Sequence, residues 1–160
     1  MSTAPVIIGF DGSPAAERAL RQSATLLAGH RALVVTVWEA GRLFEITTMP
    51  IAGLDMPPTV LDIRSAIEAD LQLYENAKRT ARRGATLARQ AGFEDAIGLA
   101  VADDLTVADT LIRLAQEHHS PGIVVGAHGH RKLSELLLGS TSNALIHRAG
   151  RPVVVVRAAS

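Results

Sequence analysis

The sequence contains no cysteine and few aromatic residues: one tryptophan, one tyrosine and three phenylalanines among 160 residues. Without cysteine, a disulfide framework and thiolate metal sites are excluded, and the composition suits a reducing compartment. No segment approaches the roughly 20 apolar residues that a membrane-spanning helix needs. The start, MSTAPVIIGFDGS, has neither a basic segment nor a long apolar one, so no secretory signal is predicted. We therefore expect a cytoplasmic protein that has no membrane partner.

Neither sign of charge predominates, because 16 acidic side chains balance 16 basic ones and no long run carries one sign. Nucleic-acid-binding proteins usually have a basic face, so we expect no nucleic-acid partner. The length fits one domain over residues 1–160, which is large enough to fold without disulfide bonds.

Short apolar segments alternate with segments of helical periodicity along the whole chain. Such apolar segments, bounded by turn residues, are typical of strands buried on both faces of a sheet. The predicted strands are 5–10, 32–38, 96–102, 122–127 and 152–157, and the predicted helices are 14–28, 59–91, 106–119 and 140–148. Ser13 is the predicted N-cap of the first helix. The second helix is long for a globular protein, so its first turns could instead be a loop or a separate short helix.

This alternation predicts an α/β fold, a parallel sheet of five strands with helices on both faces. With right-handed crossover connections, the second and third strands lie successively on one side of the first strand. The fourth and fifth strands then lie on its other side, which gives the order 3-2-1-4-5. Ligands of such sheets bind at the carboxyl ends of the strands where the order reverses. Here the reversal lies between the first strand, which ends near Asp11, and the fourth, which ends near Gly126.

Glycines and hydroxyl residues begin and end the loop that follows the fourth strand. Gly126 and Gly129 open it, and Gly139, Ser140 and Thr141 close it at the start of the last helix. Glycine lets the backbone approach a ligand closely, and the free N–H groups of a helix start favour an anion. Positive or titratable side chains lie in the same loop: His128, His130, Arg131 and Lys132. The pattern predicts a polyphosphate ligand.

The stretch GAHGH…LLLGSTSNALIHRAGRPVVVVR resembles the nucleotide-binding signature of the universal stress protein family. That signature has two glycines three apart, nine intervening residues, and then glycine followed by serine or threonine, as at Gly126, Gly129, Gly139 and Ser140. VIIGFDGSPAAERAL and ALVVTVWEA are similar to the family's first strand and helix and to its second strand. The resemblance is weakest over residues 41–62. It implies a Rossmann-like fold of the adenine nucleotide α-hydrolase type and, in one subset, binding of ATP with or without Mg²⁺.

The resemblance also implies roles for individual residues. Asp11 and the backbone of Val37 would contact the nucleoside. Gly126 and Gly129 would line the ribose and phosphate side, and the phosphates would lie against the start of the last helix. The complete candidate set is Gly9, Phe10, Asp11, Val37, Val125, Gly126, His128, Gly129, Arg131, Gly139, Ser140, Thr141 and Ser142.

Two stretches depart from the family's pattern. ADD at 102–104 stands where the family often has glycine, a polar residue and proline, and its two acids weaken the ATP interpretation. SPG at 120–122 stands where an aspartate is frequent, which we interpret as structural.

Structural explanations compete with these assignments. Asp11 could simply cap the turn before the first helix, and the glycines could be ordinary turn residues. His128 and His130 have no third ligand at metal-binding spacing, so no metal site is predicted. Asp11, Asp103 and Asp104 are the acids expected near the strand ends, and none has a recognisable catalytic partner, so no catalytic residue is assigned.

Three functions remain open at this point. The first is an ATP-binding regulatory protein of the stress response with little or no hydrolysis. The second is a slow ATPase or nucleotide hydrolase, and the third is an interaction module that binds no nucleotide. The segment PVVVVR at 152–157 predicts an exposed, strongly β-prone sheet edge. Together with the family resemblance, this edge predicts a homodimer through the last strand.

Overall fold

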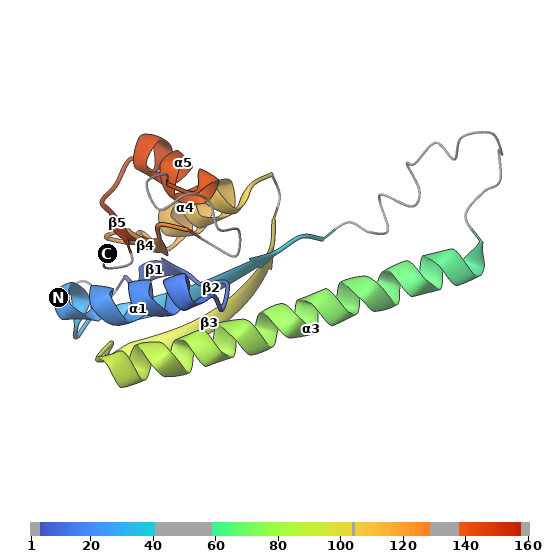
Figure 1. The fold of residues 1–160 in the computed structure, drawn as a ribbon, viewed down its shortest axis with the longest axis horizontal. Coiled ribbons are helices and arrows are strands. Elements are labelled where there is room, and N and C mark those ends of the chain that lie inside the picture. Colours follow the sequence, from blue (N-terminus) through green and yellow to red (C-terminus); the bar gives the residue numbers. More distant parts are fainter. Residues whose placement is uncertain (1–3, 41–58, 104, 129–137, 158–160) are drawn as a thin grey trace.

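The computed structural model describes residues 4–40, 59–103, 105–128 and 138–157, and these residues form an α/β fold (Figure 1). Five parallel strands make one sheet in the order β3-β2-β1-β4-β5, which confirms the predicted order. The strands are β1 (Val6–Gly9), β2 (Arg31–Trp38), β3 (Asp95–Ala102), β4 (Ile123–Gly126) and β5 (Val153–Val156). The helices are α1 (Pro14–Leu27), α3 (Val60–Ala91), α4 (Val107–Glu117) and α5 (Ser140–Arg148).

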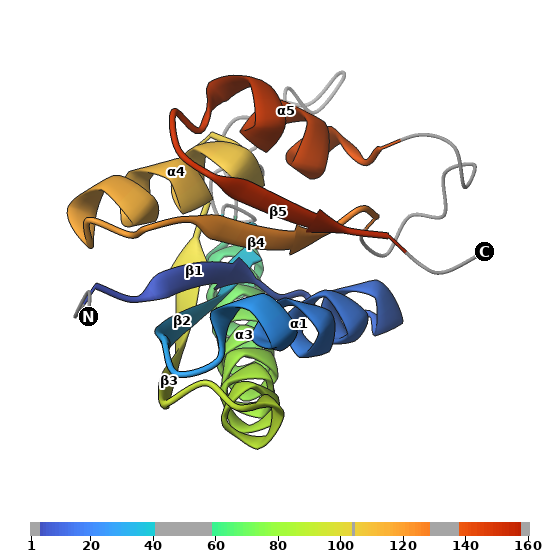
Figure 2. The same cartoon turned by 90° about the vertical axis from the view of Figure 1, so that its left-hand side faces the viewer.

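Helices cover both faces of the sheet, as Figure 2 shows, with α1 and α3 on one face and α4 and α5 on the other. Successive side chains of a strand point to opposite faces, so each strand contributes to two cores. On β1, Val6 and Ile8 pack with α1 and α3, whereas Ile7 packs with α4 and α5. All three side chains are buried, which places β1 at the centre of the molecule.

The helices begin where the sequence places capping residues. Ser13 Oγ accepts a hydrogen bond from the Ala16 N–H (3.1 Å), and Pro14 occupies the first helical position. At the start of α3, Thr59 and Asp62 cap each other's backbone reciprocally. The pKa of Asp62 is lowered most by the hydrogen bond from the Thr59 hydroxyl, and further by the hydrogen bond from the Thr59 backbone N–H. Because of this capping box, α3 is one continuous helix from Val60, and the alternative of a loop or separate helix in its first turns is wrong.

Glycine allows α3 to pack very close to the sheet. A Cβ atom at Gly98 of β3 would lie 2.4 Å from the carbonyl oxygen of Ala81 in α3. A Cβ atom at Gly84 would lie 2.7 Å from side-chain atoms of both Phe10 and Val34. Close contact between α3 and the strands therefore depends on the absence of side chains at these two positions.

Helix α3 is much longer than the strands it covers. Its 32 residues span about 48 Å, whereas the eight residues of β2 or β3 span about 26 Å. The N-terminal half of α3 therefore extends beyond the sheet (Figure 1). None of the helices in the described part of the chain is long and apolar enough to cross a membrane. The sequence of residues 40–57 has no clear period and predicts a loop, and all of it except residue 40 lies outside the described residues.

Candidate ligand-binding site

A cavity lies at the carboxyl ends of β1, β2 and β4, where the strand order reverses. It has a volume of about 170 Å³ and is open to solvent. Eight residues of the predicted set line it: Gly9, Phe10, Asp11, Val37, Val125, Gly126, His128 and Thr141. The fold thus brings both ends of the sequence to one concave surface.

Four further residues line the cavity and were not predicted: Ala16, Val35, Val107 and Leu111. Val35 could have been found, because it lies two residues before Val37 and so shares its face of β2. Val107 and Leu111 lie on successive turns of α4. Their sequence pattern indicates only a core-facing helix, and it is the packing of α4 on the sheet that brings them to the cavity.

The two ends of the cavity differ in chemistry. β2 and β4 lie on opposite sides of β1, so the residues they contribute line opposite ends. At the β2 end, the walls are the apolar side chains Val35, Val37 and Val107. At the β4 end, His128 and Thr141 contribute polar groups beside the start of α5. This arrangement suits a ligand with an apolar, flat group at one end and an anion at the other.

Asp11 lies between these ends and has a structural role as well. Its Oδ1 accepts a hydrogen bond from the Ser13 N–H (2.9 Å), which fixes the turn into α1. The interpretation of Asp11 as a turn-capping residue is therefore confirmed. The half-buried carboxylate also lines the cavity, so contact with a ligand stays a prediction.

The N-terminus of α5 carries no side-chain cap, because its N-cap is Gly139. The first-turn N–H groups of Ser140, Thr141 and Ser142 have no partners within the helix. By contrast, serine or threonine side chains cap α1, α3 and α4. Of these α5 residues, Thr141 lines the cavity, while Ser140 is exposed and does not line it.

Ser142 closes the loop and does not line the cavity. Its buried hydroxyl lies within hydrogen-bond distance of the carbonyl oxygens of Ala127 (3.1 Å) and Gly139 (3.0 Å). The Gly139 N–H also donates to the Ala127 oxygen, at 2.8 Å. These bonds hold together the two ends of the stretch between Ala127 and Gly139, and so place β4 and the start of α5 side by side.

The two described glycines of the signature allow close approach within the protein. A Cβ atom at Gly126 would lie 3.1 Å from the carbonyl oxygen of Ala15, the second residue of α1. A Cβ atom at Gly139 would lie 3.2 Å from the oxygen of Ala127. Both glycines thus leave space for a neighbouring backbone carbonyl. This structural role exists in addition to the close approach to a ligand that the sequence predicts.

Gly129 and Arg131 lie outside the described residues, as does Asp104, so their predicted roles stay predictions. Asp103 follows β3, and its N–H donates to the carbonyl oxygen of Trp38 at the end of β2 (3.0 Å). Among residues 4–40, 59–103, 105–128 and 138–157, no cluster of three or more histidine, aspartate or glutamate side chains could hold a metal ion.

A doubly covered parallel sheet with a cavity at its reversal point defines a Rossmann-like ligand-binding fold. The chain belongs to the universal stress protein family, whose sequence profile matches residues 3–157. Universal stress protein Rv2005c of Mycobacterium tuberculosis is 32% identical over 166 residues, covering 96% of this chain and 45% of that protein. The chain therefore spans about half the length of this curated relative.

Solved structures share the fold. The structure of MJ0577 from Methanocaldococcus jannaschii superimposes with a TM-score of 0.75 at 20% identity, covering 100% of this chain and 99% of that one. The universal stress protein of Archaeoglobus fulgidus in complex with dAMP gives a TM-score of 0.61 at 22% identity. That match covers 98% of this chain and 100% of the other.

Proposed function

We propose that this chain binds an adenine nucleotide, with ATP as its ligand, and acts as a regulatory protein of the stress response. The observation that carries the proposal is the cavity itself, which has an apolar end between β2 and α4 and an uncapped helix start at the other end. The dAMP complex of the Archaeoglobus relative supports an adenine nucleotide as the class of ligand. The cysteine-free composition supports a cytoplasmic location.

The chemistry of each end indicates how the nucleotide would lie. The base would fill the apolar end, against Val37 and Val107, where burial of its faces is favourable. Asp11 would accept a hydrogen bond from a ribose hydroxyl. The phosphates would lie at the N-terminus of α5, where free N–H groups and the helix dipole favour an anion, with Thr141 and His128 beside them. Gly129 and Arg131 would extend this phosphate site.

We further propose that hydrolysis is slow or absent. Phosphoryl transfer to water needs a group that orients the nucleophile and charges that stabilise the transition state. Within the described residues, Asp11 is the one acidic side chain that lines the cavity, and it already accepts from the Ser13 N–H. Mg²⁺ would then neutralise the phosphates of the ligand without creating an efficient enzyme.

Calorimetry provides a direct binding assay, and the single tryptophan provides a second one. Trp38 follows Val37 at the end of β2, but its ring packs against Tyr74 of α3, so its fluorescence should change if the ligand shifts the end of β2. We expect ATP to bind more tightly than adenosine, because the proposed anion site contacts only the phosphates. If neither ligand changes the fluorescence or releases heat in calorimetry, the interaction-module alternative is favoured. Sustained turnover of about 10 per second with Mg²⁺ would instead favour the enzyme alternative.

We also propose a homodimer through the outer edge of β5. The Ile123 N–H donates to the Pro152 oxygen and the Ala127 N–H to the Val156 oxygen, so even-numbered residues of β5 face β4. The backbone groups of Val153 and Val155 therefore point to the outer edge. A groove beside this edge is lined by β5 and by part of α1, including Leu26, whose exposed fraction is 73%. Pairing with a second β5 would cover both features.

A further inference from the structure

The part of α3 that extends beyond the sheet carries an apolar stripe. Val60, Ile67, Leu71 and Tyr74 form this stripe, with exposed fractions of 82%, 46%, 57% and 37%. Their spacings of seven, four and three residues place them on one face of the helix. An exposed apolar stripe of this length on a helix is typical of a surface that contacts another protein.

The stripe continues the face by which α3 packs on its own sheet. Further along the helix, Ala77, Ala81 and Ala85 are buried. The contact between the rings of Trp38 and Tyr74, whose centroids are 5.8 Å apart, lies at the last residue of β2. N-terminal to this contact the helix runs past the ends of β2 and β3 (Figure 1), and the stripe is exposed there.

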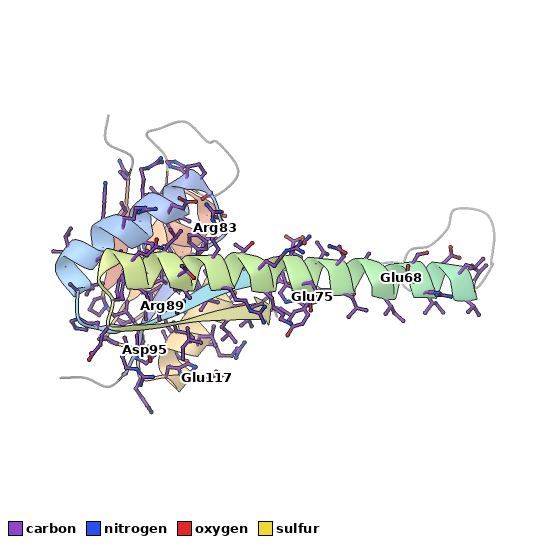
Figure 3. All side chains as sticks on the ribbon, turned by 90° about the horizontal axis from the view of Figure 1, so that it is seen from below. Glu68, Glu75, Arg83, Arg89, Asp95 and Glu117 are labelled. Carbon is purple, nitrogen blue, oxygen red and sulfur yellow. The ribbon has the colours of Figure 1, made fainter. Side chains whose placement is uncertain are left out.

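Charges on α3 are segregated along its length. Residues 60–76 contain four acids and one arginine: Asp62, Glu68, Asp70, Glu75 and Arg64. Residues 77–91 contain five bases and no acid: Lys78, Arg79, Arg82, Arg83 and Arg89. Figure 3 shows the labelled Glu68 and Glu75 on the outer half of the helix and Arg83 and Arg89 on the half against the sheet. The helix dipole favours acids in the first turn and bases in the last turn. It therefore does not explain the separation of charges along the rest of α3.

A helix with an acidic half and a basic half is complementary to its own antiparallel copy. We propose that the α3 stripe is the interface with a second copy of this chain, in which the two α3 helices pack antiparallel about a two-fold axis at Leu71. Leu71 then meets Leu71 of the second copy, and Ile67 meets Tyr74 of the second copy. Such an interface is isologous, because each helix presents the same surface to the other.

This register also brings the two charged halves together, because Glu68 lies near Lys78 of the second copy. The overlap runs from residue 60 to about residue 82, or roughly 34 Å of helix. The interface is separate from the proposed β5 edge, because α3 packs on β3 and β2 at one side of the sheet and β5 forms the other side.

Cysteine cross-linking tests the register directly, because the natural chain has no cysteine. Leu71→Cys should form a disulfide-linked dimer on mild oxidation, since the two-fold axis brings each Leu71 beside its mate. Ile67→Cys alone should not cross-link efficiently, but an equimolar mixture of Ile67→Cys and Tyr74→Cys should. Ile146→Cys, at an exposed apolar position of α5, is the matched control. If Leu71→Cys cross-links no better than Ile146→Cys, the proposal is wrong.

Sedimentation tests the apolar contact. In a Val155→Pro background, which removes the β5 edge contact, Leu71→Glu should weaken self-association at least tenfold, and Ile146→Glu should leave it unchanged. Both side chains are exposed, so the fold should survive, as circular dichroism would show. A Val155→Pro protein that is monomeric at tens of micromolar would overturn the proposal. In that case, another part of the chain or another protein covers the stripe.

Charge reversal tests the pairing of the two halves. Glu68→Lys and Lys78→Glu should each weaken self-association, and the double variant should restore it. Within one helix, Glu68 bonds to Arg64 (3.1 Å) and Lys78 to Glu75 (3.1 Å), so the double variant loses both of these contacts. Restoration can therefore come only from pairing between copies, and a double variant weaker than either single variant would contradict the antiparallel arrangement.

Discussion

Val107 tests whether the apolar end of the cavity holds the base. It lies in the first turn of α4, lines the cavity and is 37% exposed, so its side chain contributes little to the core. Truncation to alanine removes two methyl groups from the cavity wall. We therefore expect Val107→Ala to weaken nucleotide binding while it leaves the folded structure intact.

The magnitude follows from the area that a ligand could cover. Two methyl groups fully removed from water contribute about 1.6 kcal/mol, at about 0.8 kcal/mol each. Only the exposed 37% of Val107 becomes newly buried by a ligand, so about 0.6 kcal/mol is the expected loss. This corresponds to about a threefold increase in Kd. Because the contact is with the base, the same factor should apply to ATP, ADP and adenosine.

Titrations followed by Trp38 fluorescence, checked by calorimetry, measure these three affinities. The matched control is Val60→Ala, which makes the same truncation on α3, where the side chain is 82% exposed and does not line the cavity. The assignment of the base to the apolar end is refuted if Val107→Ala binds all three ligands like the parent protein. A loss confined to ATP would instead place the phosphates beside α4.

The remaining predictions concern the anion site, core packing, the sheet edge and helix capping. Thr141→Ala should raise the Kd for ATP roughly tenfold by removing a hydrogen bond to a charged group, and should leave adenosine unaffected; calorimetry compares the two. Gly98→Ala should lower the free energy of unfolding by about 2 kcal/mol through overpacking against Ala81, and thermal denaturation should show a Tm lower by about 4–8 °C. Gly84→Ala should lower Tm less, because the better helix propensity of alanine offsets part of its clash. Val155→Pro should weaken the proposed β5-edge dimer in sedimentation without unfolding the chain, whereas Val154→Pro should destabilise β5 by removing a bond to β4. Because the pKa of Asp62 is lowered in the folded state, its capping contribution is present above the ordinary carboxyl pKa and is lost as the pH falls through the folded value. The protection of first-turn amides of α3, taken relative to intrinsic exchange at each pH, should therefore fall in acid, and Asp62→Ala should abolish that dependence.

Much of the fold could be predicted because local signals and topology agree. Ser13 and Pro14 predict the start of α1, and Gly92, which adopts a φ of 114° at the C-cap, predicts the end of α3. Apolar strands between these helices leave few arrangements once crossovers are right-handed. Continuity of α3 through its first turns was harder to predict, because a helix of 32 residues is long for a globular protein. The Thr59–Asp62 capping box decides it.

The site was harder to predict than the fold. A motif shows which loops approach a ligand, so the residues near β1 and β4 could be named from the sequence. Val107 and Leu111 belong to a helix that carries no motif, and only the packing of α4 beside β1 and β2 brings them to the cavity. Val35 was missed although its alternation with Val37 predicts a shared face.

The glycine signature also has more than one physical cause, which limits what it can show by itself. Gly126 makes room for the Ala15 carbonyl, and Gly139 makes room for the Ala127 carbonyl, whether or not a nucleotide is present. Ser142 then fastens the Ala127 carbonyl to the start of α5. A chain that had lost its ligand would still need these residues to hold β4 and α5 together. The proposal of nucleotide binding therefore depends less on the signature than on the cavity beside it, and substitutions at Val107 and Thr141 test it better than substitutions of the glycines.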